Sequence, residues 1–193
     1  MGTTKVDSLS IALHSAYCSL LEGHKAVYAV VPITSGKRLW NVADGLGISE
    51  LTRVSQIAPE RYVREVLNPN CNDAMHFAAE IRRMHPRVID PSRVLVGGWT
   101  QLDYKMFWER IISEYVNALV LSPGWEFSTG CVYECLFAVQ HRIIVIDLNQ
   151  KQVPLPALRA AVLSAIKTRD RLQLRADFLT DFMDATEMLS QSS

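Results

Sequence analysis

A glutamate inside an apolar helix is the feature of this sequence that could do chemistry. Glu134 lies in a segment predicted to be helical over about 129–141, and its neighbours there are mostly apolar. It shares one helical stripe with the small residues Gly130 and Ala138, each four positions away. A carboxylate in such surroundings is costly unless it has a polar partner or a task. Glu134 is therefore a candidate catalytic residue, and the alternative is a buried carboxylate paired with an arginine or a tyrosine.

The elements before this helix would place Glu134 at the end of a sheet. Residues 118–122 form an apolar run of the kind found in a strand that is buried on both faces. A Pro123-Gly124 turn follows, and then Ser128 and Thr129, which are suited to cap the helix. Open α/β sheets bind their ligands at the carboxyl ends of their strands, so this loop is expected to border a ligand site.

Strands and helices alternate along the whole chain, which predicts an α/β fold with a parallel sheet. The strand candidates are 25–33, 87–90, 118–122 and 142–147, with a further apolar stretch at 93–96. Helices are predicted near 8–22, 49–57, 59–67, 72–85, 101–116 and 129–141, and a helical tail from about 154 to 189 with a break near 168–171. Asn68-Pro-Asn70 is expected to break the chain. We predict one flavodoxin- or Rossmann-like domain over 1–193, with about five strands, a core at about 25–150, and helical extensions at 1–24 and 154–190.

Composition narrows the classes of function and of partner. The 193 residues include 20 basic and 20 acidic side chains, and this zero net charge gives no support for a nucleic-acid polymer as partner. No apolar run approaches the roughly 20 residues that span a bilayer, so no membrane association is expected. The four cysteines form no CxxC pair, which favours reduced thiols and a cytoplasmic location. The five histidines show no ligand spacing, so neither a metal site nor a cofactor is expected.

Three segments of the sequence together resemble a known family. Residues 117–134 read as a strand, a Pro-Gly-Trp loop and then Ser-x-Gly-x-x-x-Glu opening a helix, followed by Ala138 and a strand at 143–147. Val27 to Thr34 is a strand with an early tyrosine and a loop, and Trp99 to Glu109 is a helical segment with carboxylates. In this order they resemble the nucleoside 2-deoxyribosyltransferase-like superfamily, which includes the nucleoside 5′-monophosphate N-glycosidases and uncharacterised phage and bacterial relatives. The resemblance covers roughly 25–36 and 86–148.

The resemblance implies cleavage of the N-glycosidic bond of a nucleoside or nucleoside 5′-monophosphate, by hydrolysis or by base exchange. Glu134 matches the family's glutamate nucleophile, which attacks the anomeric carbon. Tyr28 matches the tyrosine that hydrogen-bonds this nucleophile, although a tyrosine in a core strand could also serve packing alone. Glu109 falls where the family usually has an aspartate, and it departs from the pattern by its extra methylene. It could equally be a surface carboxylate paired with a neighbouring basic residue, and Asp103 is then the fallback.

The resemblance also implies a substrate-binding set around two loops. The loop 34–38 resembles the phosphate-binding loop of the monophosphate-cleaving branch, because small residues admit backbone N–H groups to an anion, hydroxyls add donors, and Lys37 and Arg38 supply charge. A solvated turn after the strand is the alternative. Ser128 matches a phosphate-contacting serine and could also be a plain N-cap, and Trp125 could stack on a base or pack at a subunit contact. The substrate-binding candidates are Pro32, Thr34, Ser35, Gly36, Arg38, Trp125, Ser128 and Gly130.

The sequence is also compatible with two other functions. Pro123-Gly124 and Glu134 loosely echo the Pro-Gly-Gly-x-Gly-Thr-x-x-Glu pattern of cytokinin-activating-type phosphoribohydrolases, although the second glycine is missing. A nucleotide-binding or scaffold protein of the same fold, without turnover, is supported by the departure at Glu109 and by the terminal helices. The family resemblance implies a nucleoside or nucleotide as substrate and a homodimer or larger homo-oligomer as the assembly.

Overall fold

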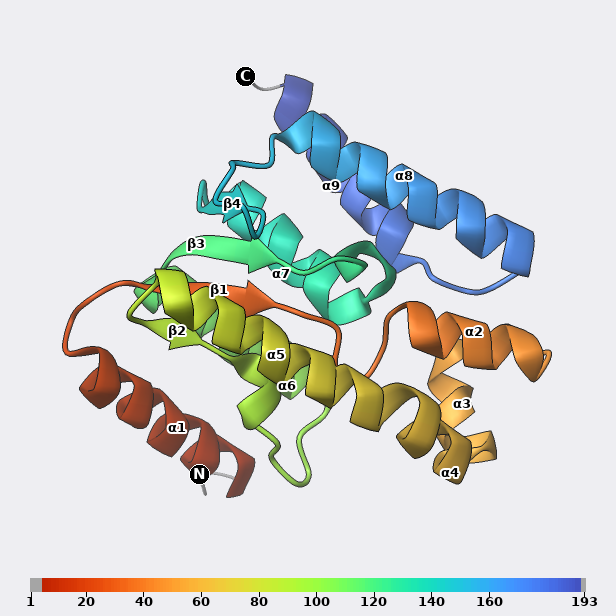
Figure 1. The fold of residues 1–193 in the computed structure, drawn as a ribbon, viewed down its shortest axis with the longest axis horizontal. Coiled ribbons are helices and arrows are strands. Elements are labelled where there is room, and N and C mark those ends of the chain that lie inside the picture. The colour runs from red at the N-terminus through yellow and green to blue at the C-terminus, as the bar shows by residue number, and fades with distance from the viewer. Residues whose placement is uncertain (1–4, 192–193) are drawn as a thin grey trace.

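Four parallel strands form the centre of the protein, in the order β2-β1-β3-β4 (Figure 1). The computed structural model describes residues 5–191. The strands are β1 (Ala26–Val30), β2 (Val88–Ile89), β3 (Val116–Leu121) and β4 (Ile144–Ile146). Tyr28 in the central strand β1 pairs with Ile89 on one side and with Leu119 on the other. The predicted parallel sheet flanked by helices is confirmed, with four strands in place of about five.

Helices connect and flank these strands. The longer ones are α1 (Lys5–Leu21), α2 (Lys37–Gly45), α5 (Asn68–Met84), α6 (Gln101–Tyr115), α7 (Thr129–Gln140), α8 (Leu155–Leu172) and α9 (Phe178–Gln191). The short ones are η1 (Leu51–Arg53), α3 (Val54–Ile57), α4 (Pro59–Tyr62), η2 (Val63–Leu67), η3 (Pro91–Arg93) and η4 (Trp125–Phe127). The long connection between β1 and β2 therefore consists of five helical segments that lead into α5.

The structure differs from the sequence-based expectations in three places. Asn68-Pro-Asn70 does not break the chain, because α4, η2 and α5 follow one another without interruption, and Pro69 comes directly after the π-helical segment η2. The apolar stretch 93–96 follows η3 as irregular chain and adds no strand. The helical tail breaks at Gln173, which adopts a left-handed conformation at the end of α8, slightly later than expected.

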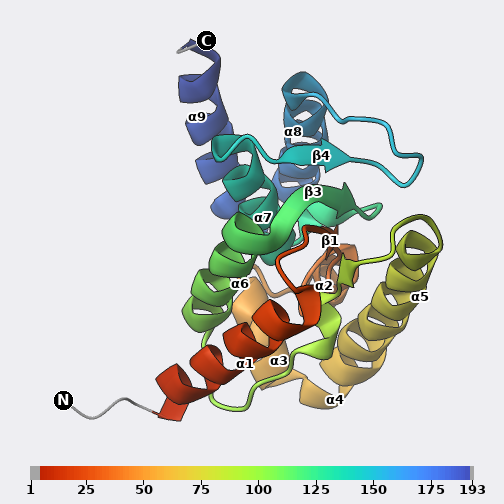
Figure 2. The same ribbon diagram turned by 90° about the vertical axis from the view of Figure 1, so that its left-hand side faces the viewer.

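Helices cover the two faces of the sheet unequally. Figure 2 shows α5 on one side of the strands and α6 and α7 on the other. On the α5 side, Val27 and Val120 of the sheet pack with Phe77 and Ile81. On the opposite side lies the larger core, which includes Tyr28 and the buried faces of α6, α7, α8 and α9. The crossovers of β1 and β3 thus leave on opposite faces, and a crevice is expected where these two neighbouring strands end.

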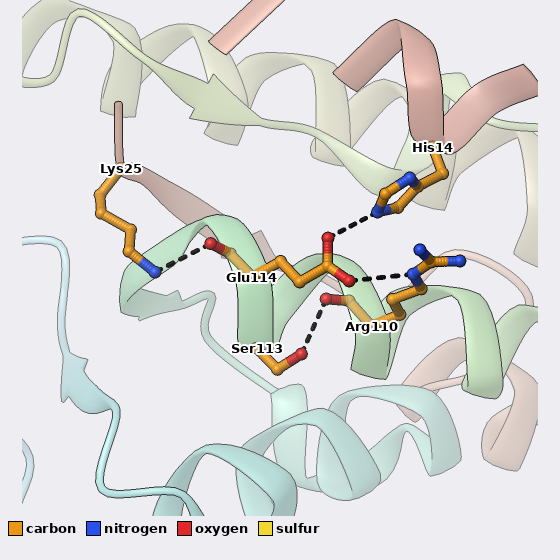
Figure 3. A network of polar contacts seen from close by, with 5 residues as sticks. All are labelled: His14, Lys25, Arg110, Ser113 and Glu114. Atoms are coloured by element: carbon orange, nitrogen blue, oxygen red, sulfur yellow. Dashed lines mark hydrogen bonds and ion pairs between the residues drawn. The ribbon is translucent and has the colours of Figure 1, made fainter. Parts of the chain in front are cut away.

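A polar network attaches α1 to α6 (Figure 3). The Glu114 carboxylate lies 2.6 Å from His14 Nε2 and accepts a 2.9 Å hydrogen bond from Arg110 Nε. Lys25 Nζ donates to the backbone carbonyl of Glu114 at 2.8 Å. Beside these contacts the ring of Tyr17 packs edge-on against Trp108. The N-terminal helix is therefore held mainly by α6, away from the carboxyl ends of the strands.

A tight turn closes the outer edge of β4. The Asp147 side chain accepts hydrogen bonds from the backbone N–H groups of Asn149 and Lys151, and the chain then folds back. Gln152 makes an antiparallel bridge with Ile146. On the other margin of the sheet, β2 has only two residues and lies between Pro86 and Pro91. None of the helices within residues 5–191 has both the length and the apolar character of a membrane span.

Candidate active site

A tyrosine and a glutamate meet beside the central strand of the sheet. Tyr28 Oη donates a 2.6 Å hydrogen bond to Glu134 Oε1, which joins β1 to α7. Tyr28 is fully buried, and its ring packs edge-on against Trp108 of α6. Glu134 is partly exposed, and none of the hydrogen bonds among residues 5–191 engages its Oε2. One carboxylate oxygen is therefore held by the protein, and the other is available to a ligand.

The surroundings of Glu134 favour its protonated form. Burial raises the pKa of this carboxyl group to about 8, and the hydrogen bond from Tyr28 opposes part of that rise. Burial, and then the negative charge of Glu134, hold the pKa of Tyr28 well above its ordinary value, so the phenol stays protonated and remains the donor. A strongly raised pKa in a partly open position, with one specific partner, is typical of functional carboxyl groups.

The two other candidate carboxylates lie on α6, and neither is hydrogen-bonded to Glu134. Glu109 is 3.8 Å from Lys105 Nζ, and the same ammonium group lies over the ring of Tyr133. Glu109 is therefore engaged with a lysine one turn earlier on its own helix, and it is this lysine that contacts α7. Asp103 accepts from the backbone N–H and the hydroxyl of Thr100 in a capping box, which lowers its pKa. The role of Asp103 in the structure is to start α6.

The loop after β1 meets the beginning of α7. Ser35 Oγ and Ser128 Oγ are 2.8 Å apart. Ser128 is buried and precedes α7, yet its side chain makes no capping hydrogen bond to that helix, and the start of α2 has no side-chain cap either. Two helix N-termini with free N–H groups thus come together at the carboxyl ends of β1 and β3. Such an arrangement favours a bound anion.

Glycine and proline give this loop its shape. Gly36 has a positive φ of 97°, and a Cβ atom there would lie 2.8 Å from Cβ of Pro32. Any other residue at position 36 would clash with the proline as well as strain the backbone. Pro32 is thus the packing surface beneath the loop, and Gly36 permits the close approach.

Arg38 points away from the loop opening and towards α5. Its Nη1 donates to Asn70 Oδ1 at 2.8 Å and to Asp73 Oδ2 at 2.7 Å. Lys37 lies on the other side, with its Nζ 5.7 Å from the centre of the Phe127 ring in η4. Of the two basic residues that follow the loop, Lys37 is thus the one beside the segment that leads to Ser128. Thr34 is exposed, and its carbonyl oxygen accepts from Tyr62 Oη at 2.9 Å.

Trp125 and Gly130 occupy different environments near the site. Trp125 is buried and packs against Phe182 of α9, with ring centres 6.2 Å apart, so its indole belongs to the core. Gly130 is exposed in the first turn of α7, and a Cβ atom added there would meet nothing within 4 Å. Open space therefore lies one turn before Glu134, on the same stripe of the helix. A ligand that reaches Glu134 from this side would pass over Gly130.

The structure adds two residues that the sequence reading did not single out. Ser122 directly follows β3; it is buried, and its hydroxyl has no hydrogen-bond partner within the described part of the chain. Its signal in the sequence is that it is the first polar residue after the apolar run. Asn70 is buried at the start of α5 and bonds the loop after β1. The sequence placed Asn70 in a chain break, and no local pattern connects it with that loop.

The assembled site combines a half-buried acid with an anion-favouring loop. Glu134 lies six positions after Ser128, about 9 Å along a helix, so one small molecule can reach both the acid and the loop. Among residues 5–191, no group of three His, Cys, Asp or Glu side chains could hold a metal ion. A shallow hollow along α4, η2 and the start of α5, lined by Pro59, Glu60, Val63, Arg64 and Asn68, includes none of the candidate residues. Comparisons with models of protein families, with curated proteins and with solved structures found no match to this chain.

Proposed function

We propose that this protein cleaves the N-glycosidic bond of a nucleoside 5′-monophosphate or nucleoside, with Glu134 as the nucleophile. The observation that carries the proposal is the 2.6 Å hydrogen bond from Tyr28 to one oxygen of a carboxyl group whose other oxygen is free. A nucleophile of this kind needs a fixed orientation and an accessible lone pair. Its place near the ends of β1 and β3, beside two uncapped helix N-termini, suits a sugar phosphate.

The chemistry follows the two-step course of retaining glycosyl transfer. The ionised Glu134 oxygen attacks C1′ of the sugar, the C1′–N bond breaks, and its electron pair leaves with the base, which takes up a proton. A glycosyl ester of Glu134 results. Water, or a second base, then attacks C1′, and the carboxylate is released as the ester bond breaks. The Tyr28 hydrogen bond favours the ionised state at both ends of this cycle, since it lowers the pKa of Glu134.

Release of free base is the direct test. The purified protein is incubated with a panel of ribo- and deoxyribonucleosides and their 5′-monophosphates, with and without an acceptor base, and products are separated by HPLC. We expect base release in at least one lane and its loss in Glu134→Gln, which keeps the size of the side chain and an acceptor for Tyr28. Release that persists at the same rate in Glu134→Gln rules out the proposed nucleophile.

A nucleotide-binding protein without turnover is the second candidate. One observation favours it: at a pKa of about 8, most of Glu134 is protonated near neutral pH, and Glu109 is engaged with Lys105. This candidate predicts that a nucleotide raises the melting temperature of the protein although no lane of the HPLC panel shows free base at any pH between 6 and 9.

A further inference from the structure

The loop between β1 and α2 is held from outside by side chains of the long β1–β2 connection. The backbone carbonyls of three successive residues, Ile33, Thr34 and Ser35, each accept a hydrogen bond from a side chain of α4 or α5. Asn70 Nδ2 donates to Ile33 at 3.0 Å and to Ser35 at 2.7 Å. Tyr62 Oη donates to Thr34 at 2.9 Å. Every carbonyl of this short stretch is therefore turned towards the same flank of the molecule.

The direction of the carbonyls fixes the direction of the N–H groups. In a planar trans peptide, the N–H of one residue points opposite to the C=O of the residue before it. The N–H groups of Thr34, Ser35 and Gly36 are thus turned away from Asn70 and Tyr62. None of the hydrogen bonds found within residues 5–191 uses these three donors. Successive N–H groups that point the same way form a concave anion site.

Both ends of the Asn70 amide group are hydrogen-bonded in this arrangement. Its two amide hydrogens serve the two carbonyls, and its Oδ1 accepts from Arg38 Nη1 at 2.8 Å. The side chain is 3% exposed, so it is not a ligand contact itself. Arg38 and Asp73 in turn fix the orientation of the amide group, since they determine which end of it faces the loop. Hydrogen bonds therefore connect Asp73 to Arg38, Arg38 to Asn70, and Asn70 to the backbone of the loop.

We infer that Tyr62 and Asn70 are positioning residues that hold the N–H groups of residues 34–36 ready for the substrate phosphate, and so set the preference for a nucleoside 5′-monophosphate over the free nucleoside. This inference rests on the proposed function. The anion lies between these N–H groups and Ser128, whose hydroxyl is already 2.8 Å from that of Ser35. Lys37 supplies a positive charge from the side of η4. Neither Tyr62 nor Asn70 touches the sugar or the base in this arrangement.

A matched pair of tyrosine variants tests the inference. Tyr62→Phe removes one hydroxyl that holds the loop. Tyr104→Phe is the control, because the Tyr104 hydroxyl also tethers a loop backbone, at Val96, but on the segment before α6. We expect Tyr62→Phe to raise KM for the monophosphate about tenfold, with kcat and the nucleoside kcat/KM changed less than twofold. Tyr104→Phe should leave the ratio of the two substrates unchanged. An equal loss for both substrates in Tyr62→Phe would show a merely structural role and overturn the inference.

Asn70→Asp sharpens the test, since it keeps the shape and the acceptor for Arg38 but places an oxygen against two carbonyl oxygens. We expect a larger loss than in Tyr62→Phe, at least thirtyfold in kcat/KM for the monophosphate alone. If this buried variant does not fold, as judged by circular dichroism, Tyr62→Phe decides the question. Asp73→Asn keeps the hydrogen bonds to the loop carbonyls. It should therefore lower kcat/KM for the monophosphate less than Asn70→Asp or Tyr62→Phe does.

Binding without turnover separates this inference from the proposed function. Isothermal titration of Glu134→Gln with inorganic phosphate and with a nucleoside 5′-monophosphate needs no catalysis. We expect both ligands to bind, and the added Tyr62→Phe change to weaken both about tenfold. This result supports the inference even if the wild-type protein releases no base. Absence of phosphate binding, or equal binding by the Tyr62→Phe protein, overturns it whether or not base is released.

Discussion

The protonation state of Glu134 links the structure of the site to its activity. Burial favours the neutral acid, whereas nucleophilic attack needs the anion. The hydrogen bond from the Tyr28 hydroxyl lowers the pKa of Glu134 and so favours the anion. The phenol can do so because its own pKa is raised, so it remains a donor over the whole working range of pH. The activity of the proposed enzyme should therefore depend on pH through one residue.

The first prediction concerns the pH profile of Tyr28→Phe. Wild-type kcat/KM should rise with pH and level off with an apparent pKa near 8, the value for the free protein. Loss of the hydrogen bond that lowers this pKa should move the rise to higher pH in Tyr28→Phe and reduce the rate at pH 7 about tenfold or more. Steady-state rates between pH 6 and 10 measure both effects. A profile that coincides with that of the wild type would separate Tyr28 from the ionisation of Glu134.

The second prediction uses the open space above Gly130. Because a Cβ atom there meets nothing within 4 Å and φ is ordinary, Gly130→Leu should not destabilise the fold, and its better helix propensity is worth up to about 1 kcal/mol. The leucine would lie one turn before Glu134 and obstruct the approach of a sugar. We expect at least a tenfold fall in kcat/KM with the melting temperature kept or raised.

Gly97→Ala is the control for this variant, since Gly97 is also unobstructed and outside the left-handed region but lies before α6. Gly97→Ala should change neither kcat/KM nor the melting temperature. Full activity in Gly130→Leu would mean that substrate reaches Glu134 from another direction.

At the scale of the elements, α1 depends on a small number of contacts with α6. Hydrogen bonds from Arg110 and then from His14 lower the pKa of Glu114, which keeps this carboxylate charged over the physiological range. Its side chain is 39% exposed, so the ion pairs themselves stabilise only modestly. The contact from His14 fixes where α1 lies, since the Arg110 pair is within α6, and the ring contact between Tyr17 and Trp108 supplies the apolar part.

The third prediction follows from this attachment. Glu114→Ala should lower the free energy of unfolding by no more than about 1 kcal/mol, yet it should increase amide hydrogen exchange in α1 several-fold. Exchange in α7 should stay unchanged, because α7 packs against α9 and α6 and not against Glu114. Mass-spectrometric exchange measures both helices in one experiment. Equal increases in both helices would mean that Glu114 supports the whole core.

Elements with a strong local pattern could be predicted, and elements decided by distant contacts could not. The apolar run of β3 and the cap-and-stripe pattern of α7 placed Glu134 correctly within a helix that follows a strand. Residues 93–96 are as apolar as a strand, but their carbonyls and N–H groups bond the Tyr104 side chain and a nearby turn instead of a neighbouring strand. Pro69 reads as a break, since proline is usually disruptive inside a helix. The sequence does not reveal the π-helical segment that precedes it.

The candidate site shows the same division. Tyr28 and Glu134 are 106 residues apart, so only the family resemblance predicted that they meet. The structure shows a hydrogen bond between the two side chains. Asn70 had no such guide: its contacts to Ile33 and Ser35 depend on how the β1–β2 connection folds back. The orientation of Arg38 towards α5 has the same origin. Charge near a loop is visible in a sequence, but the direction in which it points is not.

For the molecule as a whole, Glu134 creates a conflict between function and stability. Its pKa is about 8 in the folded protein and near 4.3 in an unfolded chain. Between these two values the native state holds more protons than the unfolded state, so the free energy of unfolding falls as pH rises. The carboxylates with lowered pKa values, such as Asp103, act in the opposite sense and only at more acidic pH.

The fourth prediction is a difference between two stability profiles. Glu134→Gln removes the ionisation and keeps an acceptor for Tyr28, so its stability should fall less between pH 5 and pH 8 than that of the wild type. We expect a difference on the order of 2–4 kcal/mol, at the lower end because the side chain is partly exposed. Urea unfolding at four pH values, followed by circular dichroism, measures it. Parallel profiles would show that Glu134 ionises freely in the folded state.

The turn after β4 has a consequence for how copies of this chain can associate. Strands with open backbone margins let sheets from two molecules merge, and they let destabilised proteins stack into fibrils. Here one margin is occupied by the chain itself, through the bridge from Gln152 to Ile146, and the other offers two residues between prolines. Merging of sheets across a dimer is therefore disfavoured at both margins. A symmetric assembly is therefore expected to use surfaces outside the sheet margins, where side-chain fit and not backbone pairing selects the partner.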